Sequence, residues 1–208
     1  MKQAFFITGT DTGIGKTYVA CQIIRDYVAQ GYRVVGMKPV AAGCDLVDGQ
    51  WLNEDVRLLT EASNVDAPLR LVNPYCFQAP IAPHIAAEQT GVEVQMEVIH
   101  AAFNELAKLA DVVVVEGAGG LLVPLNAKHS IADLIALLNI PIIFVVGMRL
   151  GCINHALLSI EVMQSRHLPI SAWVANPIDK AMLCYQENLH TLKTKLQAIP
   201  QYPNLQTS

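Results

Sequence analysis

Five short apolar runs alternate along the chain with segments whose apolar residues recur at helical spacing. These runs, rich in β-branched and aromatic residues, cover Ala4 to Thr8, Arg33 to Met37, Val112 to Val115, Ile142 to Val146 and Ser171 to Ala175. Uninterrupted runs such as Val112 to Val115 lack polar alternation, which is typical of strands covered by helices on both faces. The pattern therefore predicts an α/β fold with a single doubly wound, mostly parallel sheet flanked by helices.

Segments with helical periodicity fill the intervals between these strands. They run from Lys16 to Gln30, Glu54 to Ala62, Met96 to Ala110, Ser130 to Leu138, Ile153 to His167 and Ala181 to Leu196. The stretch from Leu69 to Thr90 is rich in proline, and we expect a long loop there; a loop of that length is often functional. Residues 199–208 are expected to form a loop and tail.

Composition narrows the class of protein. With 208 residues, 52% of them hydrophobic, the chain is expected to form one domain over residues 1–208. A formal net charge of -4 offers no broad basic surface, which disfavours nucleic acid as a partner. Polar residues and Pro141 interrupt the apolar stretch from Ile131 to Met148, so we expect no membrane span. The apolar start is too short for a signal peptide, and a cytoplasmic location is expected.

The cysteines are odd in number and widely spaced. They are Cys21, Cys44, Cys76, Cys152 and Cys184, and none forms a C-x-x-C pair. We therefore expect neither a disulfide framework nor a zinc site.

A glycine-rich segment, G-T-D-T-G-I-G-K-T over residues 9–17, follows the first predicted strand and opens the first predicted helix. The strict P-loop pattern would need glycine at position 10, so this is a variant one residue longer. Gly13 and Gly15 allow backbone N–H groups to approach a phosphate closely. Lys16 can reach the β- and γ-phosphates, and the Thr17 hydroxyl can ligate magnesium. The flanking strand and helix favour this interpretation over an ordinary glycine turn.

Acidic residues stand where they could hold that magnesium ion. Glu116 directly follows a predicted strand and so lies at its carboxyl end, where open α/β sheets bind ligands; a turn cap is the alternative. Asp55 is compatible with a metal ligand and equally with the first turn of a helix, where acids offset the macrodipole. Asp11 is a third carboxylate near the phosphates, which turn geometry explains just as well.

Lys38 follows the second predicted strand and lies at the same edge of the sheet as the P-loop. A cation there would meet the group that receives a phosphoryl group. The alternative is a solvated lysine at a strand end, which is the commoner situation.

Several motifs occur in the order found in the dethiobiotin synthetase family, which the chain resembles from Ala4 to about Asn176. They are the P-loop, K-P-V-A at 38–41, N-P-Y at 73–75, V-E-G-A-G-G at 115–120, L-G-C-I-N-H at 150–155 and W-V-A-N at 173–176. A P-loop alone recurs in many families, but this ordered set is specific. The resemblance implies a P-loop NTPase fold and an ATP-dependent enzyme of biotin biosynthesis.

The resemblance also implies the reaction. In this family 7,8-diaminononanoate, CO2 derived from bicarbonate, and ATP become dethiobiotin, ADP and phosphate. A carbamate on one amine is phosphorylated to a carbamic-phosphoric anhydride, and the second amine then closes the ureido ring. The family is homodimeric, and its substrate lies across the subunit interface.

The resemblance assigns roles residue by residue. It makes Lys16 and Lys38 catalytic, and its magnesium ligands are Thr17, Asp55 and Glu116. The nucleotide-binding residues that it implies are Gly13, Ile14, Gly15, Lys16, Thr17, Tyr18, Asp55, Glu116, Gly117, Ala118, Gly119, Asn176 and Pro177. The substrate-binding residues that it implies are Thr12, Lys38 and Ala42, with Gly151, Cys152 and Asn154 from the neighbouring chain.

Two departures from the family pattern bear on specificity. Ala42 stands where members commonly carry serine, so a hydroxyl contact to the substrate is lost. Pro177 follows Asn176 where an acid is often found, and residues 199–201 match the family's base-binding loop only weakly. We therefore expect modest discrimination between ATP and other nucleoside triphosphates.

Two other functions that occur on the same architecture are alternatives to this one. An amidoligase of the cobyrinic acid diamide synthase type would carry a glutaminase domain, for which this chain has no room. A partition-type ATPase typically needs a second lysine early in its loop and a basic or amphipathic docking surface, and residues 9–13 contain no lysine.

Overall fold

A parallel five-stranded sheet runs through the computed structural model, which describes residues 1–47 and 49–202. In spatial order its strands are β2 (Val34–Met37), β7 (Val112–Glu116), β1 (Gln3–Gly9), β8 (Ile142–Met148) and β9 (Ile170–Pro177). Every neighbouring pair in this sheet is parallel. The predicted strands are confirmed, with ends that differ by one or two residues.

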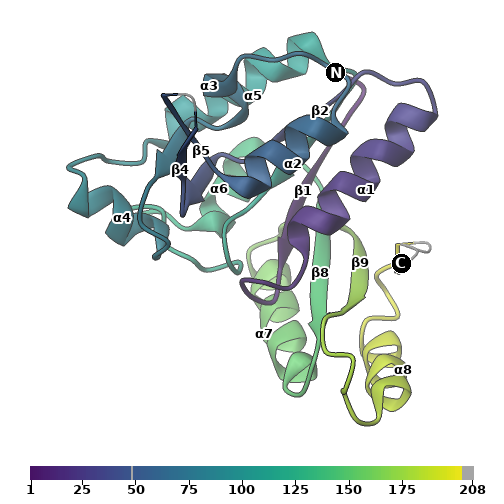
Figure 1. Cartoon of the computed structure of the whole chain (residues 1–208). Helices are drawn as coiled ribbons and strands as arrows, with labels where there is room; N and C mark the ends of the chain where they lie inside the picture. Colours follow the sequence, from purple (N-terminus) through teal and green to yellow (C-terminus); the bar gives the residue numbers. More distant parts are fainter. Residues whose placement is uncertain (48, 203–208) are drawn as a thin grey trace.

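Helices cover both faces of the sheet (Figure 1). One face carries α1 (Lys16–Ala29) and α2 (Glu54–Ala62), and the other carries α5 (Met96–Leu109), α6 (Ile131–Leu138) and α7 (Cys152–Ser165). The last helix, α8 (Tyr185–Lys195), packs beside α7 and begins later than the predicted Ala181. The doubly wound arrangement is therefore confirmed.

Alternation along the strands explains how one sheet serves two cores. Phe6 and Val113 pack with α5 and α6, whereas their neighbours Ile7 and Val114 pack with α1 and α2. Successive side chains of a strand point to opposite faces. Because both faces are buried, both sets of positions are apolar, and the strands read as continuous hydrophobic runs.

The long loop predicted from Leu69 to Thr90 is wrong, because short elements fill it. They are α3 (Leu69–Val72), β6 (Tyr75–Phe77) and α4 (Pro83–Gln89). Strand β6 pairs in parallel with β3 (Val40–Ala42), and β4 (Asp45–Val47) pairs antiparallel with β5 (Gln50–Leu52). Elements this short carry too few residues for a period to be read, and Pro83 suits the first turn of a helix.

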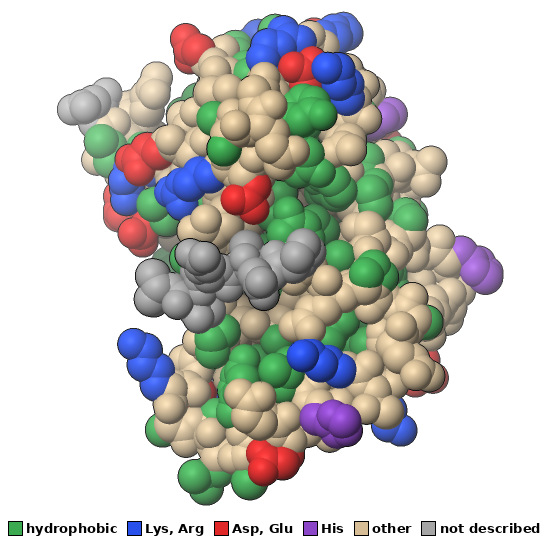
Figure 2. Space-filling view, turned by 90° about the vertical axis from the view of Figure 1, so that its right-hand side faces the viewer, with side chains coloured by type: hydrophobic (Ala, Val, Ile, Leu, Met, Phe, Trp, Pro, Cys, Tyr) green, Lys and Arg blue, Asp and Glu red, His purple; other side chains and the backbone are tan. Residues whose placement is uncertain are grey.

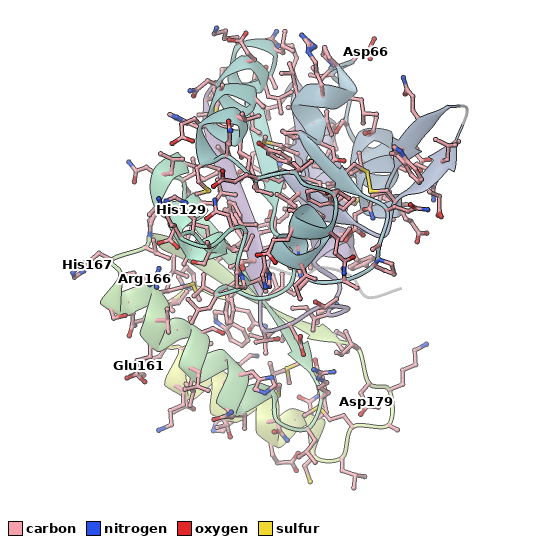
Figure 3. All side chains as sticks on the ribbon, turned by 90° about the vertical axis from the view of Figure 1, so that its left-hand side faces the viewer. Asp66, His129, Glu161, Arg166, His167 and Asp179 are labelled. Carbon is pink, nitrogen blue, oxygen red and sulfur yellow. A yellow bond between two sulfur atoms is a disulfide. The ribbon has the colours of Figure 1, made fainter. Side chains whose placement is uncertain are left out.

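A disulfide joins Cys44 and Cys76, visible as the yellow bond in Figure 3. The sequence had led us to expect no disulfide framework, and it did not predict this pair. Their Cα atoms lie 6.3 Å apart because β3 and β6 pair, with Ala41 opposite Cys76. A sequence separation of 32 residues concealed this proximity. Cys21, Cys152 and Cys184 are free thiols.

The face on the side of α1 and α8 carries charges of both signs. Figure 2 shows lysine and arginine side chains interspersed with aspartate and glutamate there. Among residues 1–47 and 49–202, no helix is long and apolar enough to cross a membrane. A surface of mixed charge suits small local ligands better than a long polyanion.

Candidate active site

A cavity of about 640 Å³ opens at the carboxyl ends of β1, β2 and β7. Its walls come from the P-loop, from the segment that follows β2, from the start of α2, from residues 80–83 and from the segment that follows β7. Ligands of open α/β sheets bind outside the carboxyl ends of the strands. The cavity thus lies where the sheet topology directs a ligand.

Two glycines let the P-loop close over this cavity. Gly13 and Gly15 both have positive φ, 70° and 85°, a region that favours glycine. A Cβ at Gly15 would also lie 2.1 Å from Nδ2 of Asn176. The loop leads directly into α1, so its backbone N–H groups and the positive end of that helix converge on the cavity.

The first half of the P-loop is fastened to β8 and to the turn that follows β8. The Thr10 N–H donates to the Val145 carbonyl at 3.0 Å, and the Asp11 carboxylate forms an ion pair with Arg149. The Lys16 ammonium donates to the Asp11 carbonyl at 2.6 Å. These contacts hold the loop in shape around its own lysine.

A buried cluster of charge fills the inner end of the cavity. The Lys38 ammonium donates to Oε1 of Glu116 at 2.6 Å and to Oδ2 of Asp55 at 2.8 Å. The Thr17 hydroxyl lies 2.8 Å from Oδ1 of Asp55 and 2.9 Å from Oε1 of Glu116. Lys38 and Glu116 are 4% and 1% exposed, so water screens their attraction little. The sequence had not decided between a functional and a structural role for Lys38 and Asp55. In the structure both belong to this one cluster.

Burial and neighbouring charge shift the protonation equilibria of this cluster. Burial raises the pKa of Glu116, and Lys38 opposes that shift. Burial works to lower the pKa of Lys38, but Glu116 and Asp55 outweigh it and hold that pKa above its ordinary value. Burial, aided by Lys38, lowers the pKa of Lys16 to about 8. Lys16 is therefore the cation that gains most from a new anion in the cavity.

The residues that the resemblance gives to magnesium fit that ion. The Thr17 hydroxyl and the two carboxylates are hard oxygen donors, and Oε2 of Glu116 is buried without a hydrogen-bond partner. Among the described residues, no group of three or more His, Cys, Asp and Glu could hold a metal ion. Two carboxylates and a hydroxyl are what magnesium uses when phosphate oxygens and water complete its shell.

Most of the predicted site residues line the cavity. They are Thr12, Gly13, Gly15, Lys16, Thr17, Lys38, Ala42, Asp55, Glu116, Ala118 and Gly119. Those that do not line it are Ile14, Tyr18, Gly117, Gly151, Cys152, Asn154, Asn176 and Pro177. Ile14 is buried beneath the loop, and Nδ2 of Asn176 donates to its carbonyl at 2.7 Å. Asn176 and Pro177 thus end β9 next to the P-loop.

The sequence analysis assigned no site role to several lining residues. They are Val40, Asn53, Pro80, Ile81, Ala82, Pro83 and Val123. The proline-rich stretch had signalled function without identifying residues 80–83. Asn53 has a local role as the N-cap of α2, but its Nδ2 also donates to the carbonyls of Ala42 and Gly43, contacts that the sequence does not reveal.

The segment from Leu150 to Asn154 lies away from the cavity, at the start of α7. Gly151 is its N-cap at φ 94°, Asn154 is exposed, and Cys152 is 2% exposed. Figure 3 shows α7 along the outside of the molecule. A second hollow of about 440 Å³ lies between α7 and residues 120–124. Apolar side chains stand exposed nearby: Leu150 at 92%, Leu158 at 56% and Leu122 at 51%.

Comparisons with known proteins agree with this geometry. A family profile described as an AAA domain matches residues 3–206. The ATP-dependent dethiobiotin synthetase BioD of Aromatoleum aromaticum is 50% identical over 196 residues, which cover 94% of this chain and 87% of that protein. The enzyme of the same name from Nitrosospira multiformis is also 50% identical, over 94% of this chain and 85% of that protein.

The fold also matches solved structures at low sequence identity. A ParA family ATPase from Chlorobium tepidum TLS superimposes with a TM-score of 0.55 at 14% identity, over 97% of this chain and 83% of that chain. A likeness at this identity concerns the fold alone.

Proposed function

This chain belongs to the ATP-dependent dethiobiotin synthetase family, and from that premise we propose how its cavity works. The chain is an ATP-dependent ligase of biotin biosynthesis. We propose that 7,8-diaminononanoate, CO2 derived from bicarbonate, and ATP react in the cavity to give dethiobiotin, ADP and phosphate. The observation that carries this proposal is the buried contact of Lys38 with Asp55 and Glu116 beside the P-loop.

The P-loop holds the triphosphate. Its backbone N–H groups bind phosphate oxygens, and the N-terminal end of α1 adds its positive dipole. Lys16 turns from the Asp11 carbonyl to the β- and γ-phosphates, where a triphosphate restores the charge that burial disfavours. Gly15, Lys16 and Thr17 thereby place the γ-phosphorus toward the side of the cavity that holds Lys38.

Thr17, Asp55 and Glu116 would hold the magnesium ion through their oxygens. When bound, the ion neutralises charge on the β- and γ-phosphates during transfer. Lys38 already contacts both carboxylates, so this chain's own ammonium offsets their negative charge and orients them. Asn53 supports that arrangement, because its Oδ1 accepts the Asp55 N–H at 3.0 Å and caps α2.

Lys38 stabilises the negative charge of the carbamate. One amine nitrogen of the diamine bonds to CO2 and loses a proton, and an oxygen of the resulting carbamate then attacks the γ-phosphorus while ADP leaves. The second amine attacks the resulting carbamic-phosphoric anhydride at carbon, phosphate departs, and that nitrogen loses its proton as the ring closes. The protein contributes mainly positioning and charge stabilisation, which suits a site built from two lysines.

The diamine lies along the outer wall of the cavity. Val40, Ala42, Pro80 and Ile81 offer apolar surface to its hydrocarbon chain. Ala42 has no hydroxyl, so polar contacts in this part of the wall fall to backbone groups. Thr12 stands at the P-loop end of the same wall.

A second copy of the chain completes the site. The carboxylate of the diamine is received by the start of α7 of the neighbouring chain, at Gly151, Cys152 and Asn154, because first-turn N–H groups of a helix lack intrahelical acceptors. Two exposed leucines, Leu150 just before α7 and Leu158 within it, support such an interface. The buried Cys152 thiol packs in the core and takes no part in the chemistry.

The adenine ring lies between the P-loop and the end of β9. Asn176 uses Nδ2 to bind the Ile14 carbonyl, and its side-chain oxygen can accept the exocyclic amino group. Pro177 follows Asn176 at the end of β9, whereas Gly117 lies at the Lys38 side of the cavity, where its carbonyl accepts from the Lys38 ammonium at 3.2 Å. A single amide contact gives modest base discrimination.

The family relationship also bears on the alternatives. Identity of 50% over 94% of the chain favours the synthetase over an amidoligase or a partition-type ATPase. The use of ATP and bicarbonate is consistent with a cytoplasmic location, which we include in the proposal.

Phosphate release from the purified chain tests the proposal. The reaction contains ATP, magnesium, bicarbonate and 7,8-diaminononanoate, and each is omitted in turn. We expect release only when all four are present, together with dethiobiotin identified by mass. Phosphate release that does not depend on the diamine, or that depends on DNA or lipid, would overturn the proposed function.

A further inference from the structure

The Cys44–Cys76 disulfide lies behind the wall that we assign to the diamine. Cys44 is 2% exposed and follows β3, whereas Cys76 is half-buried in the middle of β6. Strand β3 ends in Ala42 and β6 leads to Pro80, and both residues line the cavity. The bond therefore links the two chain segments whose separation sets the width of that wall.

Short hydrogen-bonded stretches support these segments besides the disulfide. The N–H of Gly43 donates to the Ala79 carbonyl at 3.2 Å, and that of Cys44 donates to the Phe77 carbonyl at 3.0 Å. The β3–β6 ladder itself spans three residue pairs. A ladder of this length holds its register weakly, so a covalent link between the segments has a large effect on their mobility.

The same segments also support the magnesium side of the cavity. Asn53 donates to the carbonyls of Ala42 and Gly43 at 3.1 Å each, while its Oδ1 accepts the Asp55 N–H. The Asn53 side chain is a hydrogen-bonded route by which movement of residues 42–44 would reach Asp55 indirectly. The outer wall should therefore respond more strongly than the phosphate end.

We propose that Cys44 and Cys76 form a reversible redox site that exchanges with a dithiol reductant and sets the rigidity of the diamine-binding wall. The proposal rests on the proposed function for the identity of the bound diamine and for the cytoplasmic setting. In that compartment disulfides are usually transient, and they serve catalysis or redox sensing.

The exchange balances without further reactants. A thiolate of the dithiol attacks Sγ of Cys76, the more accessible sulfur, and the disulfide breaks. Sγ of Cys44 leaves as a thiolate and takes up a proton. The second thiol of the reductant then attacks the mixed disulfide and releases Cys76. The protein gains two electrons and two protons, the reductant is oxidised to its disulfide, and an oxidised dithiol reverses the sequence.

Reduction should loosen the wall without unfolding the chain. The β3–β6 hydrogen bonds remain, so we expect the KM for the diamine to rise severalfold while the KM for ATP stays unchanged. The P-loop is fastened to β8 instead, through Thr10 and Asp11, and is independent of the disulfide.

The test compares the full-length enzyme in oxidised and in reduced dithiothreitol. Because Cys21 and Cys152 are buried, alkylation is done in denaturant; intact mass should then count three free thiols in the oxidised enzyme and five after reduction. Kinetics should then give the two KM values in each state. Cys76→Ser and Cys44→Ser should show the reduced-state KM in both buffers, and the matched control Cys184→Ser should respond like the wild type.

Hydrogen exchange gives a readout that needs no turnover. The amides of Gly43 and Cys44 should exchange faster in the reduced enzyme, whereas those of β8 should not change. Five reactive thiols in oxidised dithiothreitol, or equal diamine KM and equal exchange in both states, would overturn the redox site. Absence of dethiobiotin in both states would overturn the proposed function, and the exchange data would still decide whether the wall responds.

Discussion

Substitution of Lys38 by methionine tests the electrostatic account of the cavity most severely. The variant keeps an unbranched side chain of nearly the same length, replaces one methylene with sulfur and removes the ammonium group. Glu116, which is 1% exposed, would then lose its 2.6 Å partner, and Asp55 would lose its 2.8 Å partner. Two carboxylates would face each other across the space with no cation between them.

The expected cost follows from how deeply each partner is buried. Breaking a buried ion pair by removing one partner costs about 3 to 5 kcal/mol, because the other charge stays buried and uncompensated. The Asp55 side chain is 37% exposed, so water screens its attraction to Lys38. We therefore expect the Lys38–Asp55 contact to contribute close to the roughly 0 to 1 kcal/mol of a surface ion pair. We therefore expect Lys38→Met to lower the free energy of unfolding by about 3 to 5 kcal/mol, mostly through Glu116.

Urea unfolding at neutral pH, without nucleotide and with a chelator, measures this loss. Adding Glu116→Gln to Lys38→Met removes the stranded charge, so the double variant should be more stable than Lys38→Met alone. Lys108→Met serves as the control, since Lys108 pairs with Glu105 at the surface and should change stability by less than about 0.5 kcal/mol. A loss below about 1 kcal/mol in Lys38→Met would refute the buried-pair account.

Three further predictions concern other parts of the molecule. Gly15→Ala places a Cβ 2.1 Å from Asn176 at a φ of 85°, so nucleotide binding in a fluorescence titration should fall at least tenfold; unchanged affinity would contradict the loop geometry. Arg33 holds the pKa of Asp111 at about 2, below its ordinary 3.8. The wild type should therefore be more stable than Asp111→Asn in thermal unfolding, with the full difference in stability present above pH 3.8 and lost as pH falls toward 2. A stability difference that grows as pH falls would contradict this prediction. The kcat/KM values for ATP, CTP and GTP should lie within about a thousandfold, and a greater preference for ATP would show a stronger base pocket.

Local signals explain what the sequence predicted. The five strands were found because burial on both faces leaves an uninterrupted apolar run in each of them. The P-loop was found because Gly13, Gly15 and Lys16 stand at the spacing typical of a phosphate-binding loop, between a predicted strand and a predicted helix. Asp55 fitted both a helix start and a metal ligand; it lies in the first turn of α2 and contacts Lys38, and its role as a metal ligand stays a prediction.

Contacts between distant segments explain what the sequence did not predict. Strands β3 and β6 are three residues long, and neither can be recognised before its partner is known. The Cys44–Cys76 pair depends on that ladder, as does the position of Pro80 in the cavity wall. Asn53 likewise becomes meaningful only when Ala42 and Gly43 lie beside it. Gly151 to Asn154 lie outside the cavity of the single chain, so the role that we propose for them requires a second copy.

The most direct test of the account follows labelled carbon into product in the wild type and in Lys38→Ala. The purified chain receives ATP, magnesium, 7,8-diaminononanoate and ¹³C-bicarbonate, and mass spectrometry follows the product. The wild type should form dethiobiotin that carries the label, with one phosphate released for each molecule. Lys38→Ala should lose several orders of magnitude in rate, about 3 to 5 kcal/mol of transition-state stabilisation. Unlabelled product, no product, or a near-normal rate in Lys38→Ala would contradict the account.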